Sequence, residues 1–252
     1  MPQADFYVSS QGNDKWSGKL AQPNEMRTDG PFASIQRAQE AVRKLKNPET
    51  VLIRKGTYQL TELLVFTPED SGDTYAAYPS EKPVISGGKR ITGWTKNGEL
   101  WTANVPTGWY FSDLYVNNER RSRTRLPKEG FYHIESAISD DIKNAFHYAE
   151  GDIKPWQNMD DVEVIVFNAW DELRFHIAKL DTDTRTVTFT GSNNWPWSAW
   201  GQAKNRYYVE NVREALTQPG EWYLDRKTRV LTYYPMPGED MKKAEVIAPV
   251  LN

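Results

Sequence analysis

The chain has 252 residues, which is enough to bury the core of one large domain or two medium-sized ones. Its formal net charge of -3 excludes the strongly basic surface that binds nucleic acids or anionic membranes. The absence of cysteine excludes disulfides, thiolate metal sites and cysteine nucleophiles. No apolar run approaches the roughly 20 residues that span a bilayer.

The predicted elements begin with a short strand near residue 6 and one amphipathic helix over residues 34–46. Ser34 suits the N-cap, because its hydroxyl oxygen can accept a hydrogen bond from the first turn. Pro48 ends the helix, because the residue before a proline is disfavoured in the α region. The apolar face of this helix has helical spacing and consists of Phe32, Ile35, Ala38, Ala41, Val42 and Leu45.

Short apolar segments then recur about every ten residues, and we expect strands near residues 51–54, 63–66, 74–78 and 84–86. No second helical pattern interrupts them. This spacing is typical of a coil of parallel strands whose open first turn is covered by a single helix.

From residue 93 onward the sequence predicts antiparallel hairpins. Asn97 and Gly98 suit a two-residue type I′ turn that would place Trp94 opposite Trp101. Residues 117–118 suit the turn of a second hairpin. Alternating polarity predicts further strands at 162–167, 172–178, 186–190, 221–225 and 230–234, whereas 135–160 are expected to form irregular surface loops. Residues 244–251 form an apolar strand that returns to the coil.

A family resemblance rests on five segments: YAAYP at 75–79, PVISGG at 83–88, ITGW at 91–94, RYYVEN at 206–211 and GEWYLD at 220–225. With the capped start, they resemble right-handed parallel β-helix enzymes that act on carbohydrates, in particular glycoside hydrolase family 141. The catalytic carboxylates of that family lie on later turns of the β-helix, beyond residue 252. The resemblance therefore leaves the catalytic residues of this chain unassigned.

The expected fold is all-β and divides into three segments. Residues 1–92 form the capping helix and the start of a right-handed parallel β-helix, residues 93–243 form an inserted antiparallel β-domain, and residues 244–252 return to the β-helix. One or two turns of a β-helix leave an open end, so we also expect self-association there.

The first candidate site is a predicted strand that carries Glu172, Arg174 and His176 on one face, close to Trp170. A carboxylate, a guanidinium and an imidazole beside an indole suit sugar hydroxyl or carboxylate recognition. The alternative is a solvated strand face with an ion pair worth under about 1 kcal/mol.

The second candidate is the segment that carries Trp195, Trp197 and Trp200, because exposed loop indoles are platforms for sugar rings. The alternative is that these indoles pack in the fold.

A row of arginines, Arg120, Arg121, Arg123 and Arg125, can be interpreted in two ways. Such a row can hold acidic sugars bidentately, or it can be an edge strand protected by charge.

The sequence predicts no metal site and no cofactor, since its acidic clusters lack calcium-loop spacing.

The function expected from the resemblance is that of the N-terminal part of a glycoside hydrolase acting on plant or microbial polysaccharide. Two alternatives stay open: a non-catalytic glycan-binding module and a polysaccharide lyase. The expected partner is an oligo- or polysaccharide, neither nucleic acid nor membrane. The expected location is secreted or periplasmic, although no signal peptide is visible.

Overall fold

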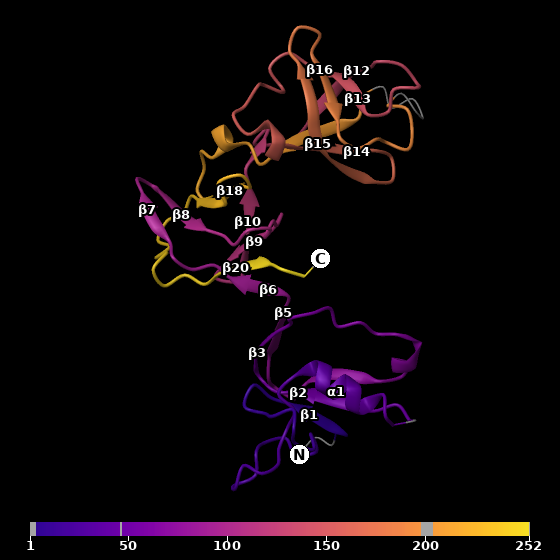
Figure 1. The fold of residues 1–252 in the computed structure, drawn as a ribbon, viewed down its shortest axis with the longest axis vertical. Coiled ribbons are helices and arrows are strands. Elements are labelled where there is room, and N and C mark those ends of the chain that lie inside the picture. Colours follow the sequence, from indigo (N-terminus) through magenta and orange to yellow (C-terminus); the bar gives the residue numbers. More distant parts are fainter. Residues whose placement is uncertain (1–3, 46, 198–203, 252) are drawn as a thin grey trace. The chain divides into compact units, whose positions relative to one another are not determined.

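The computed structural model describes residues 4–45, 47–197 and 204–251. It divides the chain into two units, which Figure 1 draws as one ribbon coloured along the sequence. Unit 1 comprises Met1–Lys89 with Pro249–Asn252, and unit 2 comprises Arg90–Ala248. No helix in the described part of the chain is both long and apolar enough to cross a membrane.

Unit 1 is built from one helix and two small parallel sheets. β1, β2 and β4 form one parallel sheet in that order, and β3 pairs in parallel with β5. The bounds are β1 (Phe6–Val8), α1 (Ile35–Val42), β2 (Thr50–Ile53), β3 (Gly56–Gln59), the 3₁₀ turn η1 (Pro68–Asp70), β4 (Thr74–Ala77) and β5 (Pro83–Ser86). The apolar face of α1 and the strands β1 and β2 supply most of the buried core.

The helix α1 lies where the sequence predicts a helix, but it ends at Val42. Ser34 is the N-cap, and its Oγ accepts a hydrogen bond from the backbone N–H of Arg37 at 3.1 Å. Asp14 fixes this cap, because its carboxylate accepts from the backbone N–H of Ser34 at 2.9 Å and from its hydroxyl at 2.8 Å.

Unit 2 begins with a curled eight-stranded sheet, in the order β6-β20-β9-β10-β18-β19-β8-β7. β10 pairs in parallel with β18, which joins two antiparallel hairpins that are about 100 residues apart in sequence. The bounds are β6 (Gly88–Arg90), β7 (Thr95–Asn97), β8 (Leu100–Asn104), β9 (Leu114–Val116), β10 (Glu119–Arg123), β18 (Glu221–Asp225), β19 (Val230–Tyr233) and β20 (Val246–Pro249).

The rest of unit 2 is an antiparallel barrel, whose strands β12 to β16 are labelled together in Figure 1. Six strands close in the order β17-β12-β13-β16-β15-β14, because β14 pairs with both β15 and β17, and β11 extends the sheet beside β17. The bounds are β11 (Arg125–Leu126), β12 (Tyr132–Ala137), β13 (Ala145–Tyr148), β14 (Glu163–Phe167), β15 (Glu172–Asp181), β16 (Thr186–Phe189) and β17 (Arg206–Glu210), with the 3₁₀ turns η2 (Met159–Asp161) and η4 (Arg213–Ala215).

The prediction of a right-handed parallel β-helix is wrong, although the chain is all-β with one α-helix among the described residues. In unit 1 the parallel pairing stops after three strands in one sheet and two in the other, and residues 63–66 form no strand. In unit 2 all strands of the described residues belong either to the curled sheet or to the barrel sheet. The physical reason is that the strand spacing indicates parallel neighbours joined by long connections, but not how many turns stack on one another, which depends on tertiary partners.

The hairpin predictions are confirmed in place but not always in register. Asn117 and Asn118, with φ of 53° and 65°, form the turn between β9 and β10 as expected for a type I′ turn. The first hairpin turns one residue later than predicted, because Gly98, with φ of 64°, takes the first loop position. Trp101 therefore lies opposite Lys96 and not opposite Trp94. The predicted loops at 135–160 are also wrong in part, since they include β13 and the end of β12.

Candidate functional site

A pocket of about 440 Å³ in unit 2 is lined by both sheets of that unit. We call it the arginine pocket. Its side chains come from β10, β11, β15, β17 and the segment before β9, namely Ser112, Asp113, Arg120, Arg121, Ser122, Arg123, Arg125, Glu172, Arg174, Tyr208 and Glu210.

A buried ion-pair network ties several of these residues together. The barrel register places Glu163 of β14 opposite Glu210 of β17 on one side and His176 of β15 on the other. Arg174 Nη1 donates to Glu163 and to Glu210, at 2.8 Å each. Arg123 pairs with Glu163 as well, and their side chains are only 2% and 5% exposed.

The charges of this network stabilise one another. Burial would raise the pKa of Glu163, but the positive charges of Arg123 and Arg174 outweigh it and lower that pKa. Burial likewise opposes the charge of Arg174, yet Glu210 and Glu163 raise its pKa by more. Glu163 is therefore a charged structural group and not a proton donor near neutral pH.

Two arginines pack against three aromatic rings beside the pocket. The guanidinium carbon of Arg125 lies 4.1 Å from the ring centroid of Tyr208, and that of Arg206 lies 4.7 Å from Phe131 and 4.8 Å from Phe167. The ring centroids of Phe131 and Phe167 are 5.3 Å apart, and Tyr208 lies 5.9 Å from Phe167. We call these five residues the aromatic cluster. Burial, assisted by nearby carboxylates, raises the pKa of Tyr208 to about 12, so its hydroxyl stays protonated and can donate a hydrogen bond.

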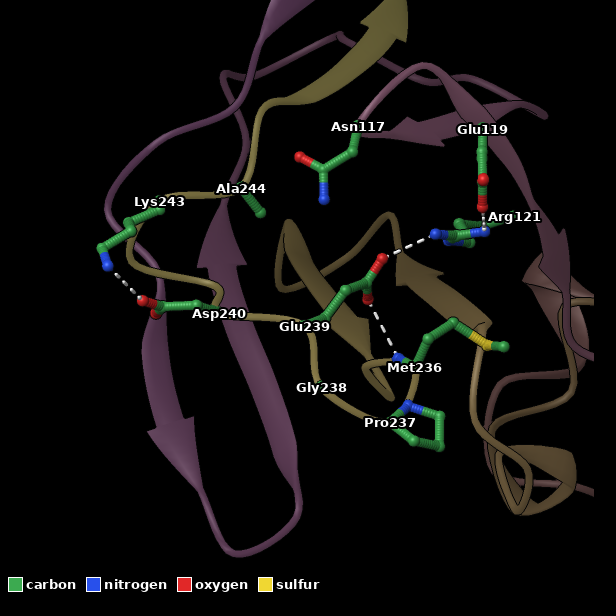
Figure 2. A pocket seen from close by; sticks show the side chains of 10 residues that line it. All are labelled: Asn117, Glu119, Arg121, Met236, Pro237, Gly238, Glu239, Asp240, Lys243 and Ala244. Atoms are coloured by element: carbon green, nitrogen blue, oxygen red, sulfur yellow. Dashed lines mark hydrogen bonds and ion pairs between the residues drawn. The ribbon is translucent and has the colours of Figure 1, made fainter.

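A second pocket, of about 460 Å³, lies on the curled sheet of unit 2, and Figure 2 shows its side chains. Arg121 donates to Glu119 at 2.7 Å and to Glu239 at 2.6 Å. Glu239 also accepts from the hydroxyl of Tyr233 at 2.6 Å and from the backbone N–H of Met236 at 2.9 Å. Arg121 holds two of the three carboxylates of this pocket, and Lys243 lies 3.5 Å from the third, Asp240. This pocket therefore lacks an acid and a base without ion-pair partners, which glycosidic bond cleavage requires.

The structure brings part of the first predicted site into the arginine pocket. Glu172 and Arg174 line it, as their shared strand face indicated. His176 lies on the same face, with Nε2 3.6 Å from a Glu163 oxygen. Trp170 lies before β15 with 79% of its surface exposed, and it does not line the pocket.

The tryptophan segment is divided in the structure. Trp195 is 51% exposed, whereas Trp197 is 2% exposed and packs edge-on against Phe146 and Phe175 in the barrel core. Trp200 lies outside the described residues. Trp197 is therefore placed as a core residue, and Trp195 keeps a surface that a ligand can reach.

The arginine row does not run along one edge strand. β10 lies between β9 and β18 and ends at Arg123, and Arg125 belongs to β11 in the barrel sheet. Among the described residues, no group of three or more His, Cys, Asp or Glu is arranged to hold a metal ion.

Sequence reasoning missed Glu210 and every member of the aromatic cluster except Arg125 as site residues. The alternation of Arg206, Tyr208 and Glu210 along β17 was a usable signal for a shared face. The positions of Phe131 and Phe167 depend on closure of the barrel, which pairs β17 with β12 and β14.

Comparison with known proteins gives one family and two solved structures. The family described as "GH141 insertion domain" matches residues 98–236, more than half of the chain. A solved structure titled "Glycoside hydrolase" aligns with a TM-score of 0.76 and 26% identity, covering 97% of this chain and 46% of that one. A second, titled "The complex structure of XylC with xylose", aligns with a TM-score of 0.42 and 16% identity, covering 96% of this chain and 31% of that one. No curated protein matches.

This chain thus spans less than half the length of the two solved structures. The family match lies within unit 2, so the barrel and much of the curled sheet correspond to the insertion domain. The chain belongs to the GH141 insertion domain family, and it resembles a glycoside hydrolase over nearly its whole length.

Proposed function

We propose that this chain is part of a glycoside hydrolase that acts on plant or microbial polysaccharide, and that unit 2 binds the polysaccharide at the arginine pocket. The family membership and the likeness to a solved glycoside hydrolase support the enzyme class. A polysaccharide substrate is extracellular, so a secreted or periplasmic location goes with the proposal.

The observation that carries the proposal is the junction of the arginine pocket and the aromatic cluster. Glycan sites combine polar groups of fixed geometry with aromatic surfaces against which the C–H groups of sugar rings pack. Here Phe131 is 36% exposed beside Tyr208, and Tyr208 lines the arginine pocket together with Arg174.

Binding by this chain is separable from bond cleavage. The carboxylates Glu210 and Asp113 of the arginine pocket are each held by an arginine, at 2.8 Å from Arg174 and 2.5 Å from Arg120, which leaves Glu172 as the one pocket carboxylate without an ion pair among the described residues. A hydrolytic pair needs one carboxylic acid and one carboxylate on opposite sides of the scissile bond. We therefore expect this chain to bind glycan and to cleave it weakly or not at all.

The test is calorimetric titration of plant and microbial oligosaccharides into the chain and into two variants. Phe131→Ala should weaken binding by about five- to tenfold, since one aromatic contact is worth about 1 kcal/mol. The control is Phe66→Ala, which removes a 50% exposed phenylalanine from unit 1 and should leave the affinity unchanged. Equal affinities of the wild type and Phe131→Ala would show that the surface around Phe131 does not bind these oligosaccharides.

Product analysis separates the two alternatives from the proposal. A hydrolase releases reducing ends, a lyase releases unsaturated ends that absorb ultraviolet light, and a binding module releases neither. The longer enzyme that contains this chain should give reducing ends, and unsaturated products would contradict the proposed class.

A further inference from the structure

We propose that the arginine pocket selects a sugar that carries a carboxylate, a uronate, and that Arg125 is the residue that binds this carboxylate. This inference rests on the proposed glycan-binding function of unit 2 and adds the chemical class of the ligand.

Most arginines of the pocket already have carboxylate partners. Arg120 pairs with Asp113, Arg121 with Glu119 and Glu239, Arg123 with Glu163, and Arg174 with Glu163 and Glu210. Arg125 differs, because it forms no ion pair with any carboxylate in the described part of the chain. An incoming anion therefore displaces no internal partner at this position.

Arg125 is nevertheless held in a defined position. Its Nε donates to the carbonyl of Pro127 at 3.1 Å, and its Nη2 donates to the carbonyl of Gly130 at 2.6 Å. Its guanidinium lies over the ring of Tyr208. Nη1 makes no hydrogen bond with the described residues, so it remains available to an acceptor in the pocket that Arg125 lines. A fixed guanidinium loses little entropy when it binds a carboxylate.

Two neighbouring charged residues have opposite effects on the binding of an anion. Arg120, with a side chain 69% exposed, supplies a second positive charge at the same pocket. Glu172 also lines the pocket and has no ion pair among the described residues. Its negative charge disfavours an anion nearby, so it opposes the binding of a uronate and limits its affinity.

The experiment compares trigalacturonate, whose carboxylates are charged, with its methyl ester, whose carboxyl groups are neutral and methylated, at pH 7 and low salt. We expect the acid to bind about ten- to a hundredfold more tightly than the ester, the range for one hydrogen bond to a charged group. This preference should shrink as salt is added, because salt screens exposed charges. A sulfated galactan trisaccharide is the third ligand and should bind more weakly than trigalacturonate.

Three variants test which residues cause the preference for the acid over the ester. Arg125→Gln should abolish the difference between acid and ester, and Arg125→Lys should retain part of it, because lysine keeps the charge but loses the planar fork. Glu172→Gln should strengthen binding of the acid and leave the ester unchanged. The matched control is Arg213→Gln, an exposed arginine of unit 2 outside the pocket, which should behave as the wild type. Thermal melting checks that each variant is folded.

Each negative result of these experiments overturns a different claim. Equal binding of acid and ester by the wild type overturns the inference and leaves the proposed glycan binding intact. Absence of binding for every oligosaccharide overturns both. Stronger binding of the sulfated ligand than of trigalacturonate overturns the assignment to a uronate, and a preserved acid preference in folded Arg125→Gln overturns the role of Arg125.

Discussion

At the scale of single residues, two tryptophans from one short segment have opposite environments. Trp197 is buried among Phe146, Phe175 and Phe189 of the barrel, whereas Trp195, two residues earlier, is about half exposed. Sequence alone makes them equivalent, because both are indoles in a glycine- and asparagine-rich segment. Because of this difference in burial, we expect Trp197 to contribute to stability and Trp195 to be accessible for binding.

We therefore predict that Trp197→Ala lowers the free energy of unfolding by about 3–5 kcal/mol, the usual cost of removing a large buried aromatic side chain. Trp195→Ala is the matched comparison and should change stability by less than about 1 kcal/mol. Urea denaturation followed by circular dichroism measures both values. Similar losses in the two variants would contradict the placement of Trp197 in the core.

A pH effect is expected at Asp70 in unit 1. Hydrogen bonds from Arg43 and from the backbone of Thr67 lower the pKa of Asp70 from 3.8 to about 2. The unfolded chain therefore takes up this proton at a higher pH than the folded chain does. The stability contributed by Asp70 is fully present above about pH 4, and it is lost as the pH falls through about 2.

Asp70→Asn tests this linkage through melting temperatures measured between pH 7 and pH 2. The variant should melt below the wild type at pH 7, and the two melting temperatures should converge as the pH approaches 2. Parallel curves over the whole range would show that Asp70 contributes nothing through its charge.

At the scale of elements, the helix and several hairpins could be predicted, because each depends on residues close together in sequence. Ser34 caps α1, Asn117 and Asn118 turn β9 into β10, and alternating polarity marks β14 and β15. The arrangement of strands could not be predicted from such patterns. Nothing local indicates that β14 pairs with β17, more than 40 residues later, or that β10 pairs with β18.

The candidate site, like the fold, could be predicted only in part. Glu172 and Arg174 were predictable, because alternation within one strand places them on one face. The partners of Arg174 were not, because Glu163 and Glu210 lie on two other strands. The parallel ladder of β1, β2 and β4 has the strand spacing that indicated a longer coil, and its length depends on tertiary partners that spacing does not encode.

The cap of α1 gives a prediction at this scale. Ser34→Ala removes the acceptor for the N–H of Arg37 and the donor to Asp14, so it should destabilise unit 1 by about 1 kcal/mol. Ser34→Gly should cost only a few tenths of a kcal/mol, because glycine leaves the helix end open to water. Urea denaturation followed by far-ultraviolet circular dichroism measures both, and equal stability of all three proteins would contradict the role of this cap.

At the scale of the whole molecule, the two units differ in how far their strand edges and apolar side chains are exposed. Unit 2 closes six strands into a barrel, which leaves those strands no free edge. In unit 1 the pair β3–β5 leaves consecutive residues of β5 uncovered, with Val84 48% and Ile85 49% exposed. Consecutive strand residues point to opposite faces, so both faces of β5 are open. Leu63, Val65 and Phe66 of unit 1 are exposed by half or more as well.

We predict that the chain self-associates through this part of unit 1. Exposed apolar side chains on an unpaired strand edge favour pairing with another copy, and one charged side chain usually prevents it. Sedimentation velocity at increasing protein concentration should show a rising average mass for the wild type and a constant monomer mass for Val84→Lys. Arg213→Lys, a surface substitution in unit 2, is the control and should associate as the wild type does. A wild type that stays monomeric at high concentration would mean that these side chains are too dispersed to drive association. Association that persists in Val84→Lys would place the contact elsewhere on the chain.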